Sequence, residues 1–475
     1  MNRIIFLILL TGVTLSSEAQ RVLSLDSCRA LAIAGNKQMT ASRVKQEVAA
    51  NLRKSARTKY LPHVSAIGGY EYTSREISIL NDDQKSALNN LGTYAGALLA
   101  TQAPALAGAI PTGAVPMLNM LGSGIADAFR TDSRNIVAGA VTLVQPVFMG
   151  GSIVAANRIA DLGVKMAANN AETVQQQTLY TVDQAYWQVV SLCHKQKLAK
   201  SYLELVRKLD ADVQKMIAEG VATRSEGLSV SVKVNEAEMT LAKVDDGLTL
   251  SRMNLLQLCG IPMNENVVLA DENIVSIDSK VSAENVDVES AVSRRPELRM
   301  LQNTVDISRQ ATNILRAGNL PQVALMGGYM ISNPNLYNGF ERKFAGAWNV
   351  GVLVRVPIWN WGDVAYKVRA AKGATTMAEL ELDEAREKIE LQVNQSSFRV
   401  GEAERRLALA ETSISKAEEN LRTANIGFRE GVISSTTVME AQTAWLQAQS
   451  QKIDAEIEVK LSQTNLQKAL GTLAP

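Results

Sequence analysis

The side chains best suited to catalysis or metal binding are few in this sequence and lie far apart. Its two histidines, His63 and His194, are separated by 131 positions (194 minus 63). No His, Cys and Asp cluster has the spacing of metal ligands, and no glycine-rich phosphate loop occurs. We therefore expect no enzyme activity, no bound metal and no cofactor.

The cysteines support a structural reading. Cys28, Cys193 and Cys259 are odd in number, widely spaced and set in helical patterns. A disulfide framework normally uses an even number of cysteines in a small exported domain. We expect buried side chains that pack as small hydrophobic groups.

Composition excludes some partners and indicates export. The 49 basic and 48 acidic residues leave no net charge to attract nucleic acid. Residues 1–19 read as a signal peptide, because Arg3 precedes an apolar run that is too short to span a membrane and Ser17-Glu18-Ala19 follows it.

The sequence contains an internal repeat with an offset of 211 residues. The paired positions are Pro146 and Pro357, Gly151 and Gly362, Glu219-Gly220-Val221 and Glu430-Gly431-Val432, and Gly260 and Gly471. Upstream, Leu61-Pro62 pairs with Leu320-Pro321 at an offset of 259. The first copy therefore holds 48 extra residues (259 minus 211), between about 81 and 132.

Each copy has the same predicted plan. The first repeat spans 20–262, with a helix over 26–59, a β-hairpin over 62–147 that carries the inserted loop 81–132, and long helices over 152–259. A linker over 263–284 leads to the second repeat, 285–475, with a helix over 285–317, a β-hairpin over 321–358 and long helices over 363–470. Alternating valines in "NVGVLVRVPIW" predict strands, and Pro146 and Pro357 are expected to mark strand ends.

The long helices require neighbours. Residues 152–219 and 363–430 contain no proline, and each would extend about 100 Å as a helix. A coiled-coil seam with steps of three and four follows Leu407, Ala410, Ile414, Ala417, Leu421, Ala424 and Phe428. Four strands cannot close a barrel, and open edges are not viable in lipid. Several identical chains must share the structure, and twelve strands from three chains would satisfy closure.

These features together resemble the TolC-type outer membrane efflux protein family. The more specific pieces are "GFREGVISSTTVMEAQTAWLQAQ" and the terminal "ALGTL". The resemblance implies a membrane α+β fold: a homotrimer whose 12-stranded β-barrel in outer membrane lipid continues into a periplasmic α-helical barrel. It also implies a passive exit duct, reached through a periplasmic adaptor from an inner-membrane pump. The rival interpretations are a periplasmic coiled-coil adaptor and a structural envelope protein without a transport role.

The resemblance also implies site residues at the periplasmic end. Glu440 matches one acid of a ring around the aperture, Thr437 stands where a second acid is usual, and Glu226 matches an acid that ties neighbouring helices shut. The alternative is that these are ordinary solvated helix residues. The adaptor would meet two tips, made of Glu219, Gly220 and Val221 and of Arg429, Glu430, Gly431 and Val432. These glycines could also simply end a helix, and both roles can hold together.

Two further features concern the membrane end. Aromatic residues near the strands suit membrane interfaces, with core packing as the alternative; they are Tyr70, Tyr72, Trp348, Trp359 and Trp361. Residues 86–126 contain no Asp, Glu, Lys or Arg, but prolines at 104, 111 and 116 deny them a spanning helix. We expect this loop to pack as short helices against its copies or over the barrel opening, narrowing the outer exit. The alternative is a floppy insertion.

Overall fold

The computed structural model describes residues 21–74, 78–102, 111, 113–130, 134–274, 287–335, 337–338 and 341–474. The predicted signal peptide and residues 275–284 of the predicted linker lie outside these ranges. The chain forms two compact units. Unit one holds residues up to 52, 160–308 and from 373 onward, and unit two holds 53–159 and 309–372.

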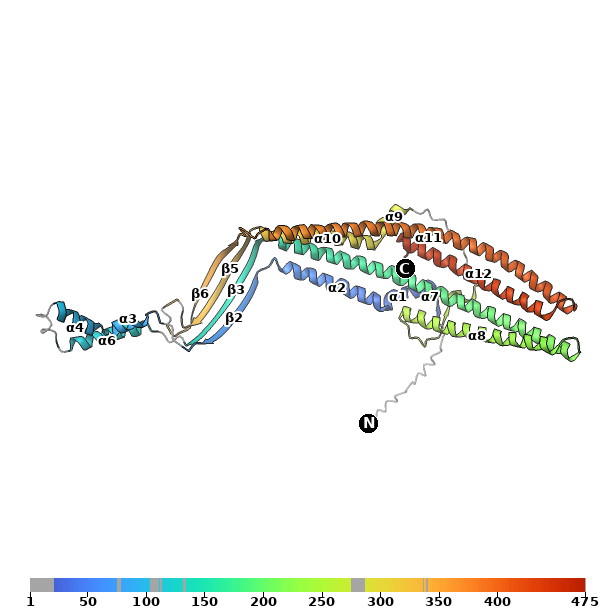
Figure 1. The fold of residues 1–475 in the computed structure, drawn as a ribbon, viewed down its shortest axis with the longest axis horizontal. Coiled ribbons are helices and arrows are strands. Elements are labelled where there is room, and N and C mark those ends of the chain that lie inside the picture. Colours follow the sequence, from blue (N-terminus) through green and yellow to red (C-terminus); the bar gives the residue numbers. More distant parts are fainter. Residues whose placement is uncertain are drawn as a thin grey trace, which may run out of the picture. The chain divides into compact units, whose positions relative to one another are not determined.

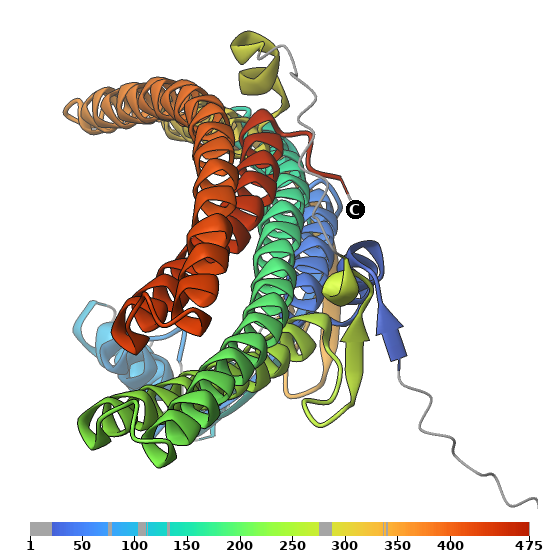
Figure 2. The ribbon, with the colours of Figure 1, turned by 90° about the vertical axis from the view of Figure 1, so that its right-hand side faces the viewer.

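Unit one is built on two antiparallel helix pairs, shown in Figure 2 in green and in red. The first pair is α7 (Ser152–Ala218) with α8 (Arg224–Cys259), and the second is α11 (Asp363–Arg429) with α12 (Ser435–Leu470). Both bounds of both pairs differ by 211 residues, as 363 minus 152 and 470 minus 259 show. The predicted long helices are confirmed.

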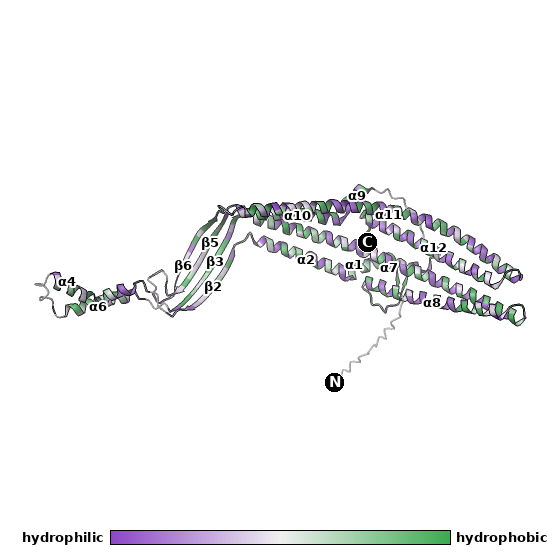
Figure 3. Cartoon of the chain, in the orientation of Figure 1, coloured by the Kyte–Doolittle hydropathy of each residue, from purple (hydrophilic) through white to green (hydrophobic). Residues whose placement is uncertain are grey.

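The predicted seam of α11 is also confirmed, since Leu407, Ala410, Leu421 and Ala424 are buried. Along the rest of the long helices, polar and apolar residues are interleaved (Figure 3). Such a pattern gives each helix one narrow apolar stripe, which is the pattern of helix-to-helix packing.

The predicted first helix of each half is wrong, because each is broken into two. The first half has α1 (Leu25–Gly35) and α2 (Lys37–Thr58), and Asn36 between them is extended, with ψ 132°. The second half has α9 (Val288–Arg294) and α10 (Pro296–Arg316), followed by the 3-10 turn η2 (Ala317–Asn319). Pro296 forces the preceding Arg295 out of the helical region, to ψ 120°.

A small two-stranded sheet in unit one occupies the described part of the predicted linker. Strand β1 (Arg21–Leu23) pairs in parallel with β4 (Val267–Leu269), and the 3-10 turn η1 (Ala270–Asn273) follows. Leu23 and Leu269 join a core cluster that also contains all three cysteines, each of them buried and none in a disulfide. The predicted burial of the cysteines is therefore confirmed.

A buried ion pair fastens α1 to α7 beside this core. The Arg29 guanidinium donates two hydrogen bonds to the Asp183 carboxylate, at 2.8 and 2.6 Å. The Asp183 side chain is fully buried. Because burial removes water from both groups, this pair fixes how α1 docks, and neither member is tolerable alone.

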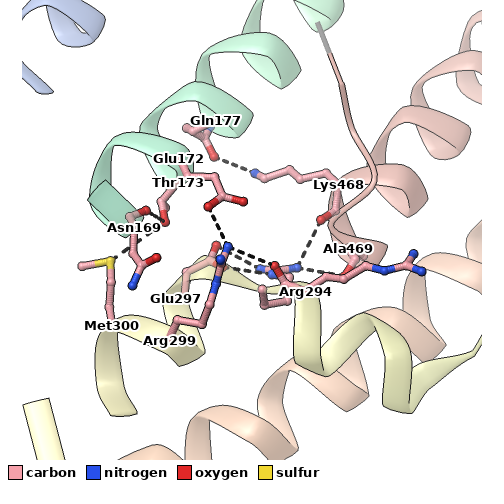
Figure 4. Close-up of polar contacts among 11 residues, drawn as sticks. Asn169, Glu172, Thr173, Gln177, Arg294, Glu297, Arg299, Met300, Lys468 and Ala469 are labelled. Carbon is pink, nitrogen blue, oxygen red and sulfur yellow. Dashed lines mark hydrogen bonds and ion pairs between the residues drawn. The ribbon is translucent and has the colours of Figure 1, made fainter. Parts of the chain in front are cut away.

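A second junction holds the end of α12 (Figure 4). The buried Arg295 side chain donates to the carbonyls of Lys468 and Ala469, at 3.3 and 3.1 Å. Arg299 donates to Glu172 on α7 at 2.6 Å. The last carbonyls of a helix have no partner within it, so Arg295 supplies donors that α12 itself lacks.

Unit two contains an antiparallel sheet in the order β2 (His63–Tyr72), β3 (Asn135–Met149), β5 (Gln322–Asn333) and β6 (Ala345–Arg355) (Figure 1). The two predicted hairpins are confirmed. Pro146 is not a strand end, however, because β3 continues to Met149. A register shift between Pro146 and Phe148 accommodates the missing N–H, at a point where the pairing with β2 has already ended.

The inserted loop contains three short helices, as expected: α3 (Asp82–Asn89), α4 (Leu91–Gln102) and α6 (Ala114–Ala128). Glycines allow them to pack closely. A Cβ added at Gly92 would lie 2.2 Å from a backbone oxygen of α6, and one at Gly122 would lie 1.9 Å from a backbone oxygen of α3. Within the ranges given above, none of the helices combines the length and apolarity that crossing a membrane requires.

Candidate functional site

Each long helix pair turns at a glycine in the left-handed conformation. Gly220 has φ +74° and Gly431 has φ +72°. At both turns the glycine N–H donates to the carbonyl three residues back, at 3.0 and 3.1 Å, and the next valine donates five residues back, at 2.8 Å. This pattern satisfies the last carbonyls of the outgoing helix. The expected glycine turns are confirmed.

The tips expose apolar side chains at equivalent positions. Val221 is 72% exposed and Val432 is 82% exposed. A Cβ added at Gly220 or Gly431 would meet no atom of the described chain within 4 Å. Folding of a single chain therefore leaves both tips open, with a valine beside an accessible backbone on each.

The two tips meet at one groove in unit one. It has a volume of about 770 Å³, and four of the seven predicted tip residues line it. These four are Val221, Arg429, Glu430 and Gly431. Leu205, Leu209 and Phe428 add an apolar part to the lining. The groove thus combines charge of both signs with an apolar surface, as protein-binding surfaces do.

Sequence reasoning missed the charged side of this groove. Lys208, Asp212 and Lys215 of α7 line it together. Their spacing of four and then three residues places them on one helix face, and this spacing was readable in the sequence.

Glu226 has a local role in its own helix. It is the third residue of α8, and its carboxylate accepts hydrogen bonds from the Thr223 backbone N–H at 2.8 Å and from the Thr223 hydroxyl at 3.0 Å. Thr223 in turn accepts from the Glu226 N–H, which completes a capping box. These bonds, the backbone one first, hold the pKa of the exposed Glu226 carboxyl below its ordinary value.

Thr437 is the same position in the second half, 211 residues later. Its N–H donates to the Ser434 side chain at 3.4 Å, and the two hydroxyls lie 3.2 Å apart. Both predicted gate positions therefore take part in helix caps. These capping bonds require no neighbouring chain.

Glu440 has a different setting. It is exposed on α12 and lines a groove of about 470 Å³ between α8 and α12. Lys233 and Glu236 of α8 line the same groove and pair with each other at 2.8 Å. Glu226 and Thr437 are not among its lining residues, so the structure does not gather the three predicted gate residues in one pocket.

The five predicted interface aromatics are all exposed on the single chain, so core packing within it is excluded. They are Tyr70, Tyr72, Trp348, Trp359 and Trp361. Trp359 and Trp361 contact edge to face, with ring centroids 5.8 Å apart.

The register of the sheet separates an apolar row from a polar row. Residues directly opposite each other across neighbouring strands project from the same face of a sheet. One row crosses all four strands as Val64, Leu143, Gly327 and Val350. The next row, on the opposite face, is Ser65, Thr142, Gly328 and Asn349. The Ser65 and Thr142 hydroxyls lie within 2.8 Å of each other.

Comparison with known proteins gives this geometry its context. The family described as "Outer membrane efflux protein" matches residues 29–261 and 288–472. The chain belongs to this family. Over 350 residues it is 22% identical to the outer membrane protein TolC of Vibrio cholerae, which covers 72% of this chain and 78% of that protein. It is 22% identical over 227 residues to the alkaline protease secretion protein AprF of Pseudomonas aeruginosa, 47% of each chain.

The fold is shared with solved channels. The outer membrane channel CmeC of Campylobacter jejuni superimposes with a TM-score of 0.73 at 15% identity, covering 94% of this chain and 85% of that one. The member of the efflux family described here is an outer membrane exit channel of the kind that serves efflux and type I secretion systems, and its helices extend into the periplasm. A periplasmic adaptor is excluded.

Proposed function

We propose that three copies of this chain form one outer membrane channel, in which each copy contributes four strands to a twelve-stranded barrel. The barrel continues into a shared periplasmic barrel of helices. The observation that carries this proposal is the four-stranded sheet with an apolar row on one face and a polar row on the other. Membrane barrels alternate in this way between lipid and lumen.

The sheet edges support the same assembly. Within the described chain, β2 and β6 each pair on one side only. Unpaired backbone groups cannot face lipid, so β6 of one copy must pair with β2 of the next. Exposed aromatics then lie where rings meet the membrane interfaces: Tyr70, Tyr72, Trp348, Trp359 and Trp361.

The equal helix bounds support a tandem duplication, with repeats over 20–262 and 285–475. Two similar units per chain give a trimer six similar units around its axis. This arrangement covers the apolar helix stripes that a single chain leaves exposed, since each helix pair gains a neighbour on both sides.

We place the adaptor contact at the two tips. The open glycine turns, the exposed valines and the groove that both tips line favour a docked helical hairpin of a periplasmic adaptor, which in turn connects to an inner-membrane pump. The seven tip residues are Glu219, Gly220, Val221, Arg429, Glu430, Gly431 and Val432.

Glu440 is the residue we assign to the periplasmic aperture, since three copies would bring three exposed carboxylates towards the axis. Thr437 leaves the neighbouring ring neutral, and Glu226 serves its helix cap. Planar bilayers test this role. Glu440→Gln should lower cation preference at neutral pH, while Glu404→Gln, an exposed position on α11 outside the groove, should leave it unchanged. Equal currents from wild type and Glu440→Gln would remove Glu440 from the aperture.

The inserted helices narrow the outer exit in this proposal. Their contacts use glycines, which leaves large apolar side chains outside, among them Leu98, Met117, Met120 and Leu121. The insertion joins β2 to β3, so the barrel would hold three copies close together at a high effective concentration. Trypsin cannot report on a segment without Lys or Arg, so shaving of intact cells should use proteinase K. Slow cleavage supports packing, and rapid cleavage supports a loose loop.

Transport itself is tested by deleting the gene and measuring sensitivity to a panel of compounds, together with secretion of exported proteins. Loss of resistance or of secretion, restored by the intact gene, is the expected result. A deletion strain unchanged on all counts would contradict the transport role.

A further inference from the structure

Two of the three cysteines are brought into contact by helices that are remote in sequence. Cys28 lies on α1, and Cys259 is the last residue of α8. The Cys259 sulfur lies 3.7 Å from the Cys28 carbonyl oxygen, and both side chains are almost completely buried. The two thiols also interact directly: the Cys259 thiol is the largest cause that raises the pKa of Cys28, ahead of burial.

The backbone around this pair leaves little freedom. A Cβ added at Gly260 would lie 3.0 Å from the carbonyl oxygen of Gly35, so the end of α1 touches the turn after α8. The Asn36 side chain donates to the Leu258 carbonyl at 3.3 Å. These contacts hold the two cysteine-bearing segments together, which is the condition a disulfide requires.

The two halves of the chain need a fastening at this place. In the second half, Leu470 stands 211 residues after Cys259, and Arg295 holds that helix end by donating to its last carbonyls. The end of α8 instead carries Cys259 against Cys28. The same helix end is thus held by an arginine in one half and contacts a thiol in the other.

We propose that Cys28 and Cys259 form a disulfide in the exported protein, which fastens α1 to the end of α8. The periplasm is an oxidising compartment. A dithiol–disulfide oxidant of that compartment would accept two electrons and two protons from the two thiols, becoming a dithiol as the Cys28–Cys259 bond forms. Because both sulfurs are buried in the folded chain, this exchange occurs before α1 docks.

Cys193 remains a thiol. It belongs to the same core, but its sulfur lies 3.6 Å from the Arg252 guanidinium. Burial raises its pKa to about 11, so it is protonated at neutral pH and does not act as the attacking thiolate.

Thiol counting tests the proposal on the protein taken from outer membranes without reductant. After denaturation in excess N-ethylmaleimide, the intact mass should show one adduct per chain, and three after prior reduction with dithiothreitol. Peptide mapping should find Cys28 linked to Cys259. Three adducts without reductant, or a linkage that includes Cys193, would overturn the proposal.

Matched variants separate the bond from a general folding defect. Cys193→Ser should show no adduct without reductant, and Cys28→Ser should show two. Should Cys28→Ser fail to accumulate, wild type and Cys193→Ser still decide the matter. The test reads sulfur chemistry alone, so it stands whether or not the channel is trimeric.

Discussion

Gly431 at the second tip allows docking to be separated from folding. Its φ of +72° lies in the left-handed region, where an L-residue costs about 1–2 kcal/mol. No described atom lies within 4 Å of an added Cβ, so a larger side chain adds no clash. This cost is small beside a typical stability of about 5–15 kcal/mol. We therefore expect Gly431→Trp to fold and assemble, while its indole fills the groove that both tips line.

Gly260 provides the matched control. It has the same φ of +72°, but an added Cβ would lie 3.0 Å from the Gly35 carbonyl oxygen. Gly260→Trp should therefore combine backbone strain with a clash against fixed backbone, and it should lower the amount of folded protein in the membrane.

The assay has two measurements. Unheated electrophoresis of outer membranes reports assembled protein, and accumulation of a fluorescent dye by the cells reports efflux. Gly431→Trp should retain assembly near the wild-type level and lose efflux. Loss of assembly equal to that of Gly260→Trp would show that Gly431 is only structural. Normal efflux by an assembled Gly431→Trp channel would refute docking at this tip.

Three other perturbations follow from the same structure. Asp183→Ala leaves the buried Arg29 charge unpaired and should cost about 3–5 kcal/mol in thermal or denaturant unfolding; a change under about 1 kcal/mol would contradict the role of the pair. Glu226→Gln keeps the cap but loses the charge. Because the folded pKa of Glu226 is lowered, its carboxylate stabilises the fold above its ordinary pKa, and this advantage over Glu226→Gln should vanish as pH falls through the folded value; an advantage independent of pH would be inconsistent with it. Gly92→Val should separate α4 from α6 and speed proteinase K cleavage, whereas Gly96→Val, whose Cβ would meet only a side-chain methyl at 3.5 Å, should not; equal cleavage of the two would contradict the packing.

Local signals predicted the parts of this fold that depend on local order. Proline-free stretches gave the long helices, and the repeated Glu-Gly-Val gave both turns. The break before Pro296 follows from the same rules and was overlooked, whereas Asn36 is a weaker signal, because a single Gly-Asn pair does not by itself end a helix.

Other parts depend on contacts between remote residues. Strands β1 and β4 contain three residues each and pair across more than two hundred positions, so periodicity has nothing to act on. The contact of Cys28 with Cys259 has the same origin. For Pro146, the rule that proline ends a strand was applied too strictly, because the loss of β2 pairing beyond Val144 leaves room for it inside β3.

The most direct test of the account is the native mass of the protein extracted from outer membranes in mild detergent. The unpaired edges of β2 and β6 and the exposed helix stripes predict a particle of three chains. A particle of one folded chain, stable in detergent and competent for efflux when returned to membranes, would contradict the shared barrel on which the proposed channel depends.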